Sequence, residues 1–121
     1  MLREFRNVRQ IEGEAKRRWF FDDYFDLIVW VDPQEEIVGF QLCYDILKMQ
    51  HALTWHKSSG FSHHRVDDGE DRPGKPKSSP VLIADGHFEY HMIAEKFRKA
   101  SENIEARVAA FIYEKIRQYP T

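Results

Sequence analysis

The densest group of side chains that could do chemistry lies at residues 63–70, where two histidines precede an arginine and three carboxylates. Imidazole and carboxylate are ligand types for zinc, manganese and iron, so this segment is a candidate metal or ligand site. Adjacent residues on a strand point to opposite faces, so His63 and His64 cannot both reach one ion without distortion. The simpler interpretation is a solvated strand end. The candidate ligand-binding residues, none of them assigned a catalytic role, are His63, His64, Arg65, Asp67 and Asp68.

A second pair of histidines, His87 and His91, lies four residues apart on a predicted helix. Imidazoles at this spacing share a helix face and can hold one ion, as they do in zinc proteins. Joined to His63 or His64 in space, they would complete a three-ligand metal site. The simpler interpretation is the polar flank of an amphipathic helix, and no cofactor is predicted from these residues.

The single cysteine, Cys43, lies on a predicted strand. A reactive thiol needs an imidazole within hydrogen-bond distance. Alternation places His51 on the opposite face and His56 on the same face but several residues along, which favours a half-buried hydrophobe. His51 falls among apolar residues, where a histidine is usually neutral and satisfied by one hydrogen bond. A lone thiol fits a reducing compartment, so we expect a cytoplasmic protein.

Basic and aromatic side chains are mixed in the N-terminal segment, a combination that can bind single-stranded nucleic acid through phosphate contacts and base stacking. Glu4, Glu12 and Glu14 halve the local positive charge, and the whole chain carries a net charge of −2. A small molecule or another protein is therefore favoured over nucleic acid as the partner. The residues concerned are Arg3, Arg6, Arg9, Lys16, Arg17, Arg18, Trp19, Phe20, Phe21 and Tyr24.

The elements that position these residues are expected to form one domain over the 121 residues. After an arm at 1–15, which we expect to be a helical turn or irregular, period-two alternation predicts an antiparallel sheet at 16–66. A Pro- and Gly-rich stretch at 67–80 is expected to be a mobile loop, followed by a short edge strand at 81–84. The strands of the sheet are predicted at 16–21, 24–31, 37–44, 48–56 and 60–66.

A helical period follows at 87–118, and Arg98, Lys99 and Ser101 mark an end and a start within it. We therefore expect two helices, at 87–100 and 102–118, with one long helix as the alternative. The predicted fold class is α+β, with four or five antiparallel strands in a meander and the C-terminal helices packed on one face.

The register of the second hairpin decides which face those helices cover. Pairing Val31 with Ile37 puts Ile28 and Trp30 on the same face as Phe40, and this larger set is expected under the helices. The other face then carries an apolar patch larger than a monomer normally leaves wet, so we expect a homodimer through it. The patch comprises Phe20, Phe25, Leu27, Val29 and Ile37.

Five strings occur in order along the predicted sheet: RRWF (17–20), FDLIVW (25–30), GFQLCYD (39–45), ALTW (52–55) and GFSHHRVDDGE (60–70). With them the chain resembles a family of small bacterial proteins of no assigned function, over roughly residues 8–84. The resemblance implies a bacterial, intracellular setting and brings no activity or site residue with it.

The sequence carries no recognised signature of a phosphate-binding loop, a serine hydrolase or a zinc protease, and no apolar run long enough for a membrane span. These observations lean against an enzyme. The favoured function is a non-catalytic module that binds a small ligand or a protein through the uncovered face of the sheet and the 60–80 loop. Two alternatives stay open: a metal-dependent hydrolase that uses His63, His64, Asp67 and Asp68, and a single-stranded nucleic-acid binder that uses the N-terminal segment.

Overall fold

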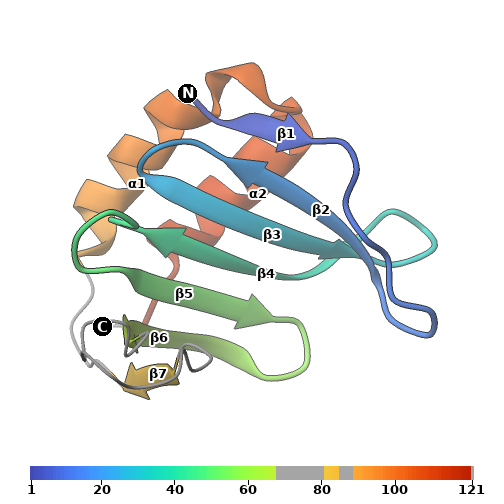
Figure 1. Cartoon of the computed structure of the whole chain (residues 1–121), viewed down its shortest axis with the longest axis horizontal. Helices are drawn as coiled ribbons and strands as arrows, with labels where there is room; N and C mark the ends of the chain where they lie inside the picture. Colours follow the sequence, from blue (N-terminus) through green and yellow to red (C-terminus); the bar gives the residue numbers. More distant parts are fainter. Residues whose placement is uncertain (68–80, 85–88, 121) are drawn as a thin grey trace, which may run out of the picture.

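The computed structural model describes residues 1–67, 81–84 and 89–120, and of residues 66, 67 and 81–84 the backbone alone. Within these ranges seven strands form one sheet in which each strand pairs antiparallel with the next, and two helices pack against one of its faces (Figure 1). The strands are β1 (Arg3–Phe5), β2 (Lys16–Phe21), β3 (Phe25–Val31), β4 (Ile37–Tyr44), β5 (His51–His56), β6 (Gly60–Asp67) and β7 (Val81–Ala84). The helices are α1 (Tyr90–Ala100) and α2 (Ala106–Arg117), joined by a 3-10 turn, η1 (Ser101–Asn103).

The α+β class and the antiparallel meander are confirmed, but the sheet has more strands than the four or five expected. Of the two strands beyond five, β7 is the edge strand expected at 81–84, and β1 lies in the arm that was expected to be helical or irregular. The residues of β1 pair with β2, where Phe5 stands opposite Trp19 with ring centroids 5.1 Å apart. Two separate helices form, because Ile104 adopts extended backbone angles between η1 and α2.

The predicted faces of β3 are wrong, because the β3–β4 hairpin contains a β-bulge. Val31 pairs with Ile37 as expected, but Trp30 pairs with Gly39, which leaves Val38 as an extra residue on β4. One extra residue reverses the side-chain alternation of everything beyond it.

As a result, Leu27 and Val29 face the helices, whereas Ile28 and Trp30 lie on the opposite face. The paired residues of β4 agree with this arrangement: Leu27 stands opposite Leu42, and Val29 opposite Phe40.

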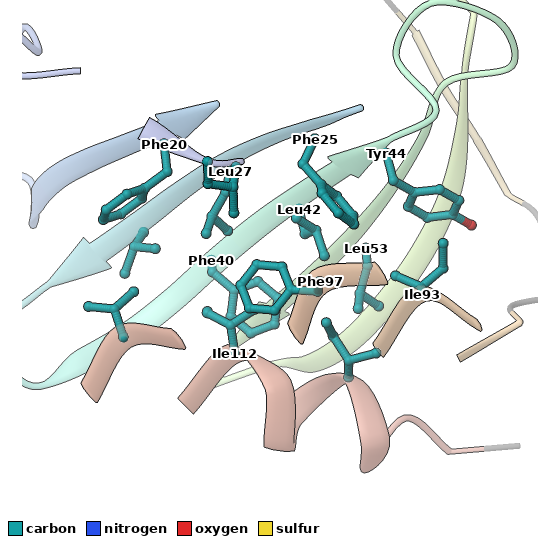
Figure 2. Packing of buried hydrophobic residues seen from close by; sticks show 14 of the residues in the cluster. Phe20, Phe25, Leu27, Phe40, Leu42, Tyr44, Leu53, Ile93, Phe97 and Ile112 are labelled. Carbon is teal, nitrogen blue, oxygen red and sulfur yellow. The ribbon is translucent and has the colours of Figure 1, made fainter. Parts of the chain in front are cut away.

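The core lies between the sheet and the helices, where Phe40, Leu42 and Phe97 are fully buried (Figure 2). Phe97 from α1 packs edge-to-face on Phe25, with ring centroids 5.8 Å apart. The patch on which the homodimer was predicted belongs to this core, so it is not available for a contact between two folded chains. Its residues are at most 6% exposed: Phe20, Phe25, Leu27, Val29 and Ile37.

The fourth predicted strand starts later than expected. Tyr44 pairs with His51, so residues 45–50 form the loop, and the strand predicted at 48–56 begins at His51. Met49, which falls within the predicted strand, is 58% exposed in this loop. His51, Leu53 and Trp55 do take the face toward the helices, as alternation predicted.

The N-terminal segment is anchored to both layers. Leu2 is fully buried, and its backbone N–H donates to the carbonyl oxygen of Ala100 at 2.8 Å. Arg18 of β2 binds Glu4 of β1 at 2.9 Å and Glu105, the residue before α2, at 3.0 Å. These ion pairs join the first two strands to the start of the second helix. No helix among the described residues is long and apolar enough to cross a membrane.

The register predicts that two large aromatic side chains, Phe40 and Trp30, contribute unequally to the free energy of unfolding. Phe40→Ala should lower the free energy of unfolding by about 3–5 kcal/mol, the range for deletion of a buried Phe. Trp30→Ala, on the face without helices, should cost clearly less. Urea denaturation followed by far-ultraviolet circular dichroism measures both. A larger loss for Trp30→Ala than for Phe40→Ala would mean that the faces of the sheet are inverted.

Candidate functional site

The face of the sheet turned away from α1 and α2 has no helix over it in the part of the chain that the structure describes; we name it the open face. Alternation along the strands identifies its side chains. Most of them are half-buried, because large neighbours cover one another. From β2 to β6 they are Arg17, Trp19, Phe21, Asp26, Ile28, Trp30, Gln41, Cys43, Ala52, Thr54, His56, Ser62 and His64.

The predicted ligand-binding segment of β6 is divided between the two faces of the sheet. His63 is buried on the side of the helices, and His64 lies on the open face, as alternation requires. Arg65 is exposed in the row of His51. Only the backbone of Asp67 is described, and it pairs with β7, while Asp68 lies outside the described residues.

The second histidine pair is not assembled into a site. His87 lies outside the described residues, and His91 is exposed on α1 with its ring against Tyr90. Within the described ranges, no three His, Cys, Asp or Glu side chains gather closely enough to hold a metal ion.

His63 belongs to a stack of rings inside the core. Its Nε2 lies 2.6 Å from the hydroxyl of Tyr44, and its ring is nearly parallel to that of His51, with centroids 5.4 Å apart. His51 Nδ1 lies 2.7 Å from the carbonyl oxygen of Met49, so this nitrogen carries the proton and donates. Tyr119, after α2, packs edge-on against His63. Such contacts are typical of a satisfied core rather than of an accessible ligand site.

One row of the open face carries Asp26, Cys43 and His64, with Ala52 between the last two. Burial raises the pKa of Asp26, and a hydrogen bond donated by Trp19 Nε1 partly opposes this. Burial also raises the pKa of the Cys43 thiol to about 11, and the charge of Asp26 adds to the effect. A thiol with that pKa is almost fully protonated at neutral pH, so Cys43 is a poor nucleophile.

The N-terminal arm borders one end of the open face. There a side chain of the arm bonds to the backbone of β2, in place of the backbone pairing of a strand. The amide of Gln10 donates to the carbonyl of Arg17 at 2.9 Å and accepts from its backbone N–H at 2.8 Å. The guanidinium of Arg17 in turn donates to the carbonyl of Arg9. These bonds hold residues 7–10 beside β2.

A cleft of about 340 Å³ remains between this arm and the open face, and we name it the aromatic cleft. Its walls are mostly apolar, and its polar side chains include the carboxylate of Asp26 and the guanidinium of Arg17. The Nε of Arg17 is buried and has no hydrogen-bond partner. The lining residues are Phe5, Asn7, Val8, Arg9, Arg17, Trp19, Asp26 and Ile28.

A larger hollow of about 680 Å³ adjoins the cleft, and we name it the basic hollow. It shares Phe5, Val8 and Arg17 with the aromatic cleft. Its remaining basic side chains include Arg3, Arg6 and Lys16, and its two carboxylates, Glu4 and Glu105, are both bound to Arg18. The two hollows together place an apolar cleft next to a positively charged one.

Comparison with models of protein families, with curated proteins and with solved structures finds no match for this chain. The resemblance to small bacterial proteins stays a prediction. The sequence did single out the N-terminal basic and aromatic residues. It missed the cleft, because only the register shows that Trp19 and Ile28 face outward together and that Phe20 is buried.

The raised pKa of Asp26 predicts a pH dependence of stability. The folded chain holds a proton on this carboxyl more readily than the unfolded chain does, so this contribution is present at low pH and lost as pH rises through the folded pKa. Asp26→Asn should therefore be more stable than the wild type at neutral pH, and this advantage should shrink on acidification. Urea midpoints across the acid range measure it, with Asp23→Asn as the exposed control. An unchanged difference at all pH values would contradict the effect of burial.

The row of the open face that contains Asp26 and Cys43 also predicts slow alkylation of the Cys43 thiol. With its pKa near 11, alkylation by iodoacetamide at neutral pH should be roughly a hundredfold slower than for a free cysteine. Asp26→Asn removes the neighbouring charge, so the pKa of Cys43 should fall and alkylation should accelerate. Rates measured by mass spectrometry over pH 7–10 follow the fraction of thiolate and compare the two proteins. Equal profiles for the two proteins would show that the charge of Asp26 does not act on the thiol.

Proposed function

We propose that this protein is a non-catalytic binding module whose ligand inserts a flat, largely apolar ring into the aromatic cleft. The observation that supports this function is the cleft itself. Phe5, Trp19 and Ile28 offer apolar contact, while a few polar side chains, Arg17 and Asp26 among them, can orient a ligand. Concave, mostly apolar sites with a few fixed polar groups are the usual form of small-molecule sites.

The polar groups of the cleft favour a ligand with hydrogen-bonding atoms on its edge. A buried donor without a partner costs about 1–3 kcal/mol, and a ligand acceptor at the Nε of Arg17 would recover part of this. Asp26 accepts from Trp19 and has a raised pKa, so it can accept from a ligand when charged or donate when protonated. The ligand we expect is therefore a heteroaromatic group rather than a hydrocarbon.

Binding without catalysis is the better account of the open face for two reasons. The protonated Cys43 is a poor nucleophile, and the imidazole of His64 is separated from it by the strand that carries Ala52. The histidines predicted for a hydrolase do not share a face. As part of the same proposal, the lone thiol is consistent with a reducing, cytoplasmic setting.

The three tryptophans provide a built-in test. Trp19 lines the cleft and Trp30 lies elsewhere on the open face, whereas Trp55 packs under the helices against Phe111. Titration with a set of heteroaromatic fragments, followed through the three indole N–H signals by NMR, should perturb Trp19 most and Trp55 least. Dissociation constants of about 0.1–1 mM are expected for ligands of this size.

Matched variants separate the cleft from the rest of the open face. Trp19→Leu should abolish fragment binding, while Trp30→Leu, the same change on the neighbouring strand, should leave it within about twofold. Perturbation of Trp55 alone, or equal losses in the two variants, would contradict a site in the aromatic cleft.

A further inference from the structure

We infer that the ring bound in the aromatic cleft is a base of a single-stranded nucleic acid, whose phosphate backbone runs through the basic hollow. This inference rests on the proposed function and names its ligand class. Its basis is the position of an apolar, ring-binding cleft beside a positively charged hollow, with three residues common to both.

The aromatic side chains of the open face form one continuous cluster rather than isolated rings. The rings of Phe5, Trp19 and Phe21 lie with centroids 5.1–6.4 Å apart, and the guanidinium of Arg3 stands 5.8 Å from the centroid of Phe21. More than one base can therefore stack on this surface, which a chain of nucleotides would use and a single nucleotide would not.

The cleft also contains hydrogen-bonding groups that can bind the edge of a base. Bases carry acceptors and donors side by side on one planar edge, and they hydrogen-bond through it when unpaired. In the cleft, the unpartnered Nε of Arg17 can donate to a base acceptor, and the carboxylate of Asp26 can accept from a base donor. A paired base in a duplex has this edge occupied, so a single strand is the form that fits.

The charge balance that disfavours nucleic acid in the sequence is altered by the fold. Glu4 lines the basic hollow, but it is bound to Arg18. Glu14 lines a neighbouring hollow, which shares Lys16 with the basic hollow. Glu12 lines neither the cleft nor the basic hollow.

Among the described residues, Arg3, Arg6 and Lys16 form no ion pair. The basic hollow therefore keeps positive charge that phosphates could neutralise.

The position of the phosphate follows from the shared wall. Phe5, Val8 and Arg17 border both hollows, so a base in the cleft leaves its sugar at this wall and its phosphate on the side of Arg3 and Arg6. Stacking holds the base, and the arginines hold the backbone. Neither stacking nor phosphate binding distinguishes strongly between the bases, so we expect weak sequence preference.

Fluorescence anisotropy with a labelled single strand of about ten nucleotides, as DNA and as RNA, tests the inference at about 50 and 200 mM salt. Binding should weaken about tenfold to twentyfold between these salt concentrations, because about three phosphate contacts would be replaced by ions. The same sequence as a duplex should bind more weakly than the single strand. A mononucleotide, tested by competition, should bind far more weakly than the strand.

Variants distinguish stacking from simple charge attraction. Trp19→Leu should weaken binding at least fivefold, the lower end of what one stacked base contributes. Arg6→Gln should weaken binding and reduce its salt dependence, whereas Arg98→Gln, the same change at an exposed site on α1, should do neither. Circular dichroism of each variant establishes that it is folded.

The outcomes separate this inference from the proposed function. If fragments perturb Trp19 but no single strand binds at the lower salt concentration, the inference fails and the binding module stands. If a mononucleotide competes as well as the strand, the ligand is a free nucleotide and the strand is excluded. If Trp19→Leu binds as the wild type does and heparin competes equally, only charge attraction is present and the inference is overturned.

Discussion

The extra residue at Val38 determines which side chains of β3 the helices cover. Without this bulge, Ile28 and Trp30 would turn inward, and Asp26 would turn inward with them because it shares their alternation. A carboxylate under the helices would lie in an apolar layer with no cation beside it, at a cost of several kcal/mol. The bulge instead buries Leu27 and Val29 and leaves Asp26 half-buried on the open face, where Trp19 hydrogen-bonds to it. The core and the aromatic cleft thus depend on one local irregularity.

Much of the fold is contained in local patterns of the sequence. The strand over residues 37–44 and the short strand over 81–84 have the predicted bounds, and the two helices end within a residue of those expected. These elements have strong internal signals: alternation, turn residues and a helical stripe. β1 has no such signal, since three exposed residues become a strand only when β2 offers its edge. The position of β1 therefore depends on its pairing with β2.

The face of β3 could have been inferred from one residue. Hydrophobic size favours burying Ile28 and Trp30, but their face also contains Asp26, and the face of Leu27 and Val29 contains no charge. The charged member is the stronger indicator, because burying an unpaired carboxylate costs more than leaving a tryptophan half-exposed. The candidate site follows the same logic. The two histidines of the polar segment at 63–70, His63 and His64, lie on opposite faces of the sheet, whereas the cleft combines residues whose common face no string of sequence displays.

Every strand pair of the sheet joins strands that follow one another in the described sequence, so its hairpins can form while the chain is still being synthesised. Leu2 is different, because the carbonyl of Ala100 that receives its N–H belongs to the end of α1. This anchor between the N-terminal segment and the helical layer therefore forms only after α1 has emerged from the ribosome. Until both helices have emerged, a nascent sheet would expose the apolar side chains that the helices later cover, such as Phe25 and Phe40, and that face is the one most prone to a wrong contact.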